Sequence, residues 1–150
     1  MDPQAVQEVG RIGAIAAVSL GAAGSALGTS IAGRAAVGVW KKAYAQGRPA
    51  LFTLFTFVGA PLSQTIYGMI LMFTMAGKAD DGFNPWGLLG IGVFAGLAIG
   101  MSAWMQGLAG AAGADALGET GEGFTNYLSV IGIVETVAIF VMVFVIIILG

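Results

Sequence analysis

A long apolar run near the end of the chain, residues 128–149, most constrains what this sequence can fold into. It is long enough to cross a bilayer, which takes about 20 mostly apolar residues, and its only charged residue is Glu135. A carboxyl at membrane depth is costly, and such residues usually serve ion or proton transport. We therefore expect the other apolar segments to surround this carboxyl. The alternative is that Glu135 stays protonated in a contact between helices, or lies nearer to the membrane surface.

The composition indicates a membrane protein and argues against several other classes. Of the 150 residues, 57% are hydrophobic and 9% are charged, against about 25% charged residues in soluble domains. The chain has no cysteine and no histidine, which removes disulfides, thiolate metal sites and the commonest general base. The net charge of -2 argues against a nucleic-acid partner, which needs a basic surface. The ATP-binding pattern G-x-x-x-x-G-K-[ST] is also absent from the sequence.

Four apolar segments predict an all-α membrane protein with four transmembrane helices. The expected spans cover about residues 12–37, 50–76, 86–113 and 128–149. Small residues recur at spacings of three and four in the first and third spans, which places them on one face of each helix. Such faces allow another helix to approach closely. The positions are Gly21, Gly24, Gly28, Ala32 and Ala35, then Gly96, Gly100, Ala103, Gly107 and Gly110.

The centre of the second span holds polar side chains beside a proline. Ser63, Gln64 and Tyr67 follow Pro61, and residues three and four apart share one helical face. Proline leaves a backbone carbonyl one turn back without its helical partner, so that this carbonyl can act as a ligand. The third span contains one strong hydrogen-bonding side chain, Gln106. We expect these residues to form a polar site inside the membrane.

Polar connections separate the spans and predict their orientation. The first polar connection runs from about Arg34 to Pro49, and its loop is expected at 38–49. Four of the six basic residues of the chain lie in this connection. The positive-inside tendency places it in the cytoplasm. A turn-rich connection at 78–85 follows the second span. An acidic loop at 114–124 precedes the last span and by parity lies on the cytoplasmic side too, with both termini on the opposite side.

The sequence contains an internal repeat. Residues 25–33 align with residues 102–110, and both segments begin with Ser-Ala and end with Ala-Gly. Gln64 aligns in the same way with Glu135, and each is followed by threonine. The chain therefore reads as two tandem transmembrane hairpins in the same orientation, residues 1–80 and residues 81–150. The second hairpin has a carboxyl where the first has an amide.

The polar residues of both hairpins meet if the hairpins pack side by side. Carboxylate, amide and hydroxyl oxygens would then surround one point, and hard cations prefer such ligands. A proton carrier needs only the carboxyl and an acceptor, so the additional oxygens favour Na+ over H+. A glutamine could instead donate its amide hydrogen to an ionised carboxylate. The residues are therefore compatible with either ion.

With these residues the chain resembles the duplicated four-helix proteolipids of rotary V-type ATPases, the K or c subunits, and in particular their sodium-pumping bacterial type. The resemblance rests on the glycine-rich spans, residues 61–68, Gln106-Gly107 and residues 133–136. The family has threonine and leucine where this chain has serine and alanine, changes that keep a hydroxyl and a main-chain ligand. The resemblance implies that Tyr67 hydrogen-bonds Glu135. It also implies that Na+ is bound by Ser63, Gln64, Gln106, Glu135 and the backbone carbonyl of Ala60.

The resemblance further implies a rotor ring of identical subunits in a bacterial plasma membrane, in contact with lipids. A stator subunit of the a or I type would release the ion from Glu135 through an essential arginine, and central-stalk subunits would bind the cytoplasmic loops. The chain would be a non-catalytic subunit of an ATP-driven sodium- or proton-translocating ATPase. Two other classes stay open. A small secondary transporter needs a substrate cavity near the carboxyl, and in a structural membrane protein Glu135 has no transport role.

Overall fold

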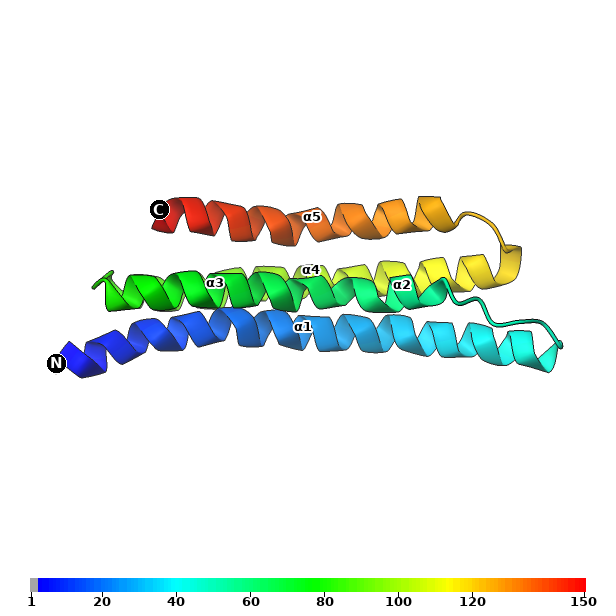
Figure 1. Cartoon of the computed structure of the whole chain (residues 1–150), viewed down its shortest axis with the longest axis horizontal. Helices are drawn as coiled ribbons and strands as arrows, with labels where there is room; N and C mark the ends of the chain where they lie inside the picture. Colours follow the sequence, from blue (N-terminus) through cyan, green and yellow to red (C-terminus); the bar gives the residue numbers. More distant parts are fainter. Residues whose placement is uncertain (1–2) are drawn as a thin grey trace.

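The computed structural model describes residues 3–150 as a bundle of long helices (Figure 1). In this range the elements are α1 (Pro3–Ala45), α2 (Leu54–Gly59), a 3-10 turn η1 (Ala60–Leu62), α3 (Ser63–Asp80), α4 (Pro85–Thr120) and α5 (Phe124–Leu149). The segment from α2 to α3 is one continuous rod. Within the described range, four helical rods are long and apolar enough to cross a membrane. The predicted fold class, all-α with four membrane spans, is confirmed.

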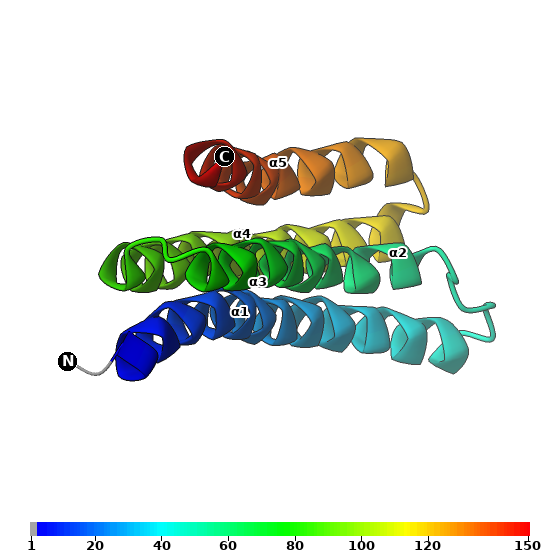
Figure 2. The same cartoon turned by 60° about the vertical axis from the view of Figure 1, so that its left-hand side comes forward.

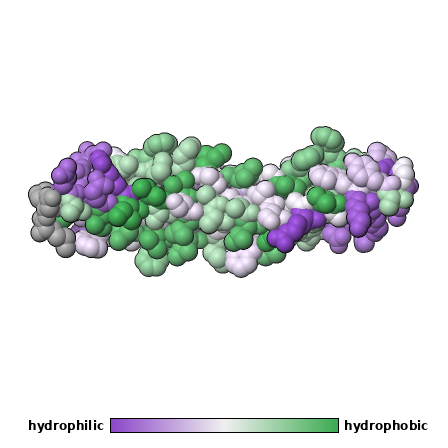
Figure 3. Space-filling model, turned by 90° about the horizontal axis from the view of Figure 1, so that it is seen from below, coloured by the Kyte–Doolittle hydropathy of each residue, from purple (hydrophilic) through white to green (hydrophobic). Residues whose placement is uncertain are grey.

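The pair of α3 and α4 forms the middle of the bundle. In both views α1 lies on one side of this pair and α5 on the other (Figures 1 and 2), and each of these outer helices contacts both α3 and α4. The connections 46–53 and 121–123 lie at one end, whereas the start of α1, the end of α5 and the connection 81–84 lie at the other. On the face shown in Figure 3, hydrophobic side chains cover most of the middle and hydrophilic ones gather toward the two ends. A bundle that crosses a bilayer has this distribution.

Glycine allows α1 and α4 to touch backbone to backbone. A Cβ atom added to Gly24 would lie 2.0 Å from the carbonyl oxygen of Gly100, and one added to Gly107 would lie 2.2 Å from the Cα of Gly28. A larger residue at either position would push the two backbones apart. The small-residue faces of the first and third spans therefore pack on each other, as their spacing predicts. Close packing of this kind drives helix association in lipid, where hydrophobic burial does not.

The predicted loop at 38–49 is wrong, because α1 continues to Ala45 and only residues 46–53 connect it to α2. Lys41 and Lys42 thus lie on the last turns of the helix. Hydropathy marks the part of a helix that lies in lipid, whereas the backbone hydrogen bonds continue into water. At about 1.5 Å per residue, the 43 residues of α1 extend far beyond the hydrocarbon thickness of about 30 Å.

The predicted loop at 114–124 is wrong for the same reason. The helix α4 continues until Gly121 ends it in the left-handed conformation, with φ of 74°, and only residues 121–123 connect it to α5. Glu119 therefore lies on the helix, and its carboxylate is 3.5 Å from Nζ of Lys42. The basic and acidic segments meet as helical turns at one end of the bundle.

The connection between α3 and α4 is a turn, as predicted, but it is shorter than residues 78–85. The helix α3 continues to Asp80, which leaves residues 81–84. Asn84 then caps α4, because its Oδ1 accepts hydrogen bonds from the backbone N–H groups of Trp86 at 3.0 Å and Gly87 at 3.1 Å. The cap and the proline that follows it determine where α4 begins.

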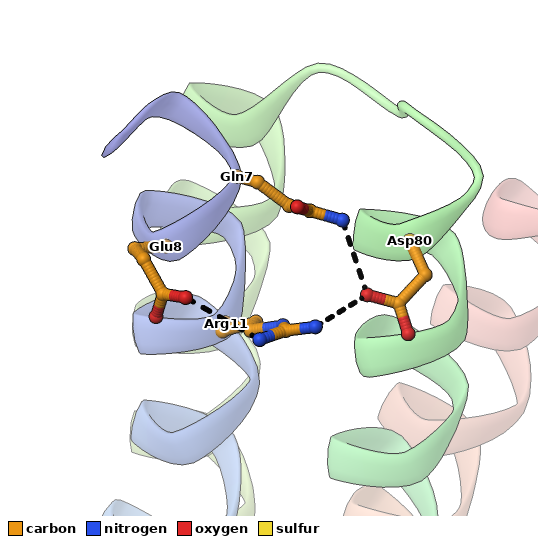
Figure 4. A network of polar contacts seen from close by, with 4 residues as sticks. All are labelled: Gln7, Glu8, Arg11 and Asp80. Carbon is orange, nitrogen blue, oxygen red and sulfur yellow. Dashed lines mark hydrogen bonds and ion pairs between the residues drawn. The ribbon is translucent and has the colours of Figure 1, made fainter. Parts of the chain in front are cut away.

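A charged network joins α1 to α3 near the N-terminal end of the bundle (Figure 4). Arg11 donates to Oδ1 of Asp80 at 2.9 Å and to Glu8 at 3.3 Å, and Gln7 donates to the same oxygen of Asp80 at 3.2 Å. These side chains are exposed, so water and salt screen their interaction. The network aligns the two helices at the end of α1 opposite to Lys42.

The glycine contact generates a first prediction. Gly24→Ala should lower the melting temperature of the protein purified in detergent by several degrees, because the added methyl group meets the backbone of α4. Gly38→Ala is the matched control on the same helix, since a Cβ atom there meets nothing within 4 Å. Equal melting temperatures of the two variants would contradict the contact.

Candidate ion-binding site

Side chains from three helices converge on Glu135. It is half-buried on α5, and its Oε1 accepts a hydrogen bond of 2.5 Å from the hydroxyl of Tyr67 on α3. Its Oε2 accepts one of 3.1 Å from Nε2 of Gln106 on α4. Both donors are neutral, and within residues 3–150 no ion pair involves Glu135. A polar group in an apolar environment needs hydrogen-bond partners, and the carboxyl of Glu135 finds them in these two uncharged donors.

Gln106 connects Glu135 to the second span. Its side chain is fully buried, and its Nε2 also donates to the backbone carbonyl of Ile131 at 3.2 Å. Its Oε1 accepts from Nε2 of Gln64 at 2.8 Å. A carbonyl can only accept, so Ile131 requires the nitrogen of Gln106 to face α5 and its oxygen to face α3. In the same way, Gln64 has to turn its nitrogen toward Gln106, which leaves its oxygen for Ser63.

The proline of the second span produces a 3-10 turn at the site. Pro61 lies in η1, between α2 and α3, and its missing N–H interrupts the regular α-helical pattern. Ser63 begins α3 directly after this turn. Its Oγ lies 3.0 Å from the carbonyl oxygen of Ala60 and 3.1 Å from Oε1 of Gln64. Three oxygens of different chemical groups therefore lie together at the break in the helix.

The structure brings all the predicted site residues into one connected network. They are, in order of contact, Ala60, Ser63, Gln64, Gln106, Glu135 and Tyr67. The sequence did not identify the carbonyl of Ile131, or the hydroxyl of Ser102, which donates to the carbonyl of Val134 at 3.0 Å. Every residue has a backbone carbonyl, so the sequence cannot indicate which carbonyl accepts a hydrogen bond from another helix. Ser102, however, lies one turn before Gln106 on the same helical face, a spacing that could have identified it.

The network offers one negative charge and several neutral oxygens. Carbonyl, hydroxyl and amide oxygens come from the second span, and the carboxylate comes from α5. These are the hard ligands that cations such as Ca2+ and Mg2+ prefer, and Na+ is of the same kind. The oxygen of Gln106 already accepts the N–H of Gln64. A cation that takes this oxygen as a ligand therefore has to replace that hydrogen bond.

Comparison with known proteins covers the same part of the chain. Residues 89–148 match the family model that describes the C subunit of ATP synthase. This match includes most of α4 and α5, and with them Gln106 and Glu135. Residues 89–148 are thus similar to the C subunit of ATP synthase.

A second comparison extends over most of the chain. The A-type ATP synthase subunit K of Methanocaldococcus jannaschii is 31% identical over 132 residues, which are 88% of this chain and 57% of that protein. The chain therefore spans little more than half the length of this relative. Both matches confirm the resemblance to the proteolipids of rotary ATPases. The bacterial, sodium-pumping type stays a prediction.

The hydrogen bond from Tyr67 generates a second prediction. A carbodiimide has to reach the carboxyl of Glu135, and the hydroxyl of Tyr67 occupies Oε1 of that carboxyl. At a fixed pH, Tyr67→Phe should therefore raise the rate at which a carbodiimide labels Glu135 several-fold, as measured by mass spectrometry. Tyr44→Phe, which changes an exposed tyrosine on α1, should leave the rate unchanged. An unchanged rate in Tyr67→Phe would show that this hydrogen bond has no influence on the carboxyl.

Proposed function

We propose that this chain is the ion-carrying subunit of the rotor ring of a rotary ATPase. The observation that carries the proposal is the single membrane carboxyl of Glu135, held by Tyr67 and Gln106 from two other helices. The matches to the C subunit of ATP synthase and to an A-type ATP synthase subunit K support the same role. The sequence lacks the pattern G-x-x-x-x-G-K-[ST], and in this proposal the chain carries the ion while another part of the complex hydrolyses ATP.

The cargo is Na+, bound once per subunit. Its ligands are the carboxylate of Glu135 and a set of neutral oxygens, from Ser63, Gln64, Gln106 and the backbone of Ala60. The close approach of three of these oxygens at the η1 turn supports this ligand set. When Na+ enters, the amide of Gln64 releases Gln106, and both amide oxygens turn to the ion. Tyr67 keeps its hydrogen bond to Glu135 and holds the carboxylate in place.

Transport requires that Glu135 exchange its ion at a defined place. In the proposed cycle, the guanidinium group of a stator subunit of the a or I type approaches the carboxylate and displaces Na+. The carboxylate passes the stator paired with that arginine, takes up a new Na+ on the other side and returns to the lipid phase as a neutral site. Because only a neutral site enters lipid at low cost, rotation is coupled to ion movement.

The exposed surfaces of the bundle fit a ring of identical chains in lipid. Eight large apolar side chains of α5 are exposed in the single chain, which leaves them for a neighbouring copy or for lipid. The tightly packed faces of α1 and α4 would form the inner wall, and α3 and α5 the outer wall. Central-stalk subunits would bind the end of the bundle that carries Lys42 and Glu119, on the cytoplasmic side of a bacterial plasma membrane.

Carbodiimide labelling of the purified ring tests the identity of the ion. Sodium at millimolar concentration should protect Glu135 from labelling at a pH where potassium does not, because bound Na+ keeps the carboxylate from being protonated. If labelling depends on pH and ignores Na+, the same residues carry H+ and the sodium assignment is wrong. If Glu135 is never labelled, its carboxyl is structural and the rotor function itself is wrong.

The role of Glu135 generates a third prediction. Glu135→Gln keeps the size and the hydrogen-bonding capacity of the side chain, so the ring should assemble normally. ATP-driven ion transport in vesicles that contain the complete complex should be lost, because an amide cannot release and rebind a cation as a carboxylate does. Glu8→Gln, which removes an exposed carboxylate at the opposite end of the bundle from Lys42, is the control and should keep most of the transport activity.

A further inference from the structure

The last helix packs on the bundle through one apolar stripe. Its buried residues Ile131, Ala138 and Leu149 belong to two core clusters, whereas eight of its large apolar side chains are exposed. Lipid is as apolar as these side chains, so apolar packing determines the rotation of α5 less sharply than it would in water. Yet the rotation of α5 about its own axis decides where the carboxyl of Glu135 points.

Two hydrogen bonds from α4 reach the backbone of α5 next to Glu135. Oγ of Ser102 donates to the carbonyl of Val134 at 3.0 Å, and Nε2 of Gln106 donates to the carbonyl of Ile131 at 3.2 Å. The donors are four residues apart on one face of α4, and the acceptors are three residues apart on α5. Backbone carbonyls move only with their helix. These two bonds therefore hold the helix itself and not one of its side chains.

Among the residues that the structure describes, the hydrogen bond of Ser102 differs from those of the other serines and threonines in the spans. Serine and threonine in helices commonly donate to a carbonyl of their own helix, as Thr74 does to Ile70 and Ser129 does to Thr125. Ser102 is only 5% exposed and donates to another helix. Gln106 also bonds Gln64 and Glu135, and these contacts have to change when an ion binds. The bond of Ser102 to a backbone carbonyl can persist throughout.

The internal repeat supplies a comparison within the same chain. Ser25 on α1 occupies the position that corresponds to Ser102, and it is 2% exposed. Its hydroxyl has no hydrogen-bond partner among the residues that the structure describes. Close packing holds the helices there instead, since a Cβ atom on Gly68 of α3 would lie 2.9 Å from the carbonyl oxygen of Ala17 on α1. Among the described residues, the serine at this position of the repeat thus donates a hydrogen bond to another helix in the second hairpin, which carries the carboxyl, but not in the first.

We propose that Ser102 is a positioning residue that sets the rotation of α5 and thereby directs Glu135 toward Gln106 and Tyr67. The inference rests on the proposed function of Glu135 as the ion carrier. Without this hydroxyl, the hydrogen bonds from α4 to the backbone near Glu135 are reduced to the one from Gln106, and apolar packing alone opposes a small rotation of α5 about that bond. The carboxylate then meets its donors and its ion less often, although the fold is kept.

The experiment compares Ser102→Ala with Ser25→Ala in the assembled ring. Each variant removes one buried hydroxyl from the same position of the repeat, and ring assembly is checked by size-exclusion chromatography. Carbodiimide labelling of Glu135 is then measured over a range of Na+ concentrations. In Ser102→Ala, the Na+ concentration for half protection should rise by about fivefold, the scale of one neutral hydrogen bond. In Ser25→Ala it should stay at the wild-type value.

Each outcome decides the inference. An unchanged half-protection value in Ser102→Ala overturns it, and so does an equal rise in both variants, which would indicate general loosening of the bundle. Should Ser102→Ala not assemble, Ser102→Cys keeps the size with a weaker donor and is expected to give a smaller rise in the same direction; no rise overturns the inference.

If Na+ does not protect the wild-type ring, the sodium assignment fails separately. The comparison then uses the rate of labelling at one fixed pH, which Ser102→Ala should change and Ser25→Ala should not.

Discussion

A carboxyl group in an apolar environment needs hydrogen-bond donors, and the arrangement of the helices around Glu135 follows from this need. A charged or polar group that enters such an environment without a partner costs several kcal/mol, on the order of 2–7 for a neutral group. Glu135 receives its donors from Tyr67 and Gln106, on two helices other than its own. Gln106 can serve both neighbours because α4 contacts both α3 and α5, and the amide of Gln106 offers a donor to α5 and an acceptor to α3. The central position of the α3–α4 pair is therefore what makes the site possible.

The bundle combines two ways of holding helices together in lipid. Backbone contact through glycine joins α1 to α4, and it leaves no room for movement, because even a methyl group would not fit at Gly24 or Gly107. Hydrogen bonds to the backbone and to Glu135, together with an apolar stripe, join α5 to the rest, while eight of its large apolar side chains are exposed. The rigid pair of α1 and α4 thus supports α5, and polar contacts help to orient α5. This division suits a site that has to exchange an ion, since side chains at α5 can rearrange while the α1–α4 contact stays unchanged.

Most of the fold and the site could be predicted because polar residues are rare in these spans. Gln64, Gln106 and Glu135 interrupt apolar sequence, and an intramembrane polar residue is kept where it has a partner or a function. The glycine spacing likewise predicted close helix packing, which the contact of Gly24 with Gly100 confirms. The predicted bounds of the loops at 38–49 and 114–124 are wrong, because hydropathy indicates which residues lie in lipid and not where the backbone hydrogen bonds of a helix end. Ser102 was overlooked as a donor, since a serine in a small-residue helix reads as one more small residue.

The sequence by itself determined that four helices cross a membrane, that their glycine faces pack closely and that one carboxyl lies among amides and hydroxyls. These properties depend on composition and on spacing within single helices, which a sequence contains. The tertiary structure alone decided which atoms meet: the nitrogen of Gln106 faces Glu135 because the carbonyl of Ile131 can only accept a hydrogen bond. It also decided that Ser102 finds a partner on α5 while Ser25 finds none among the described residues. Contacts between helices depend on their rotation and relative height, and these follow from the packing of the whole bundle and not from the spacing along any one helix.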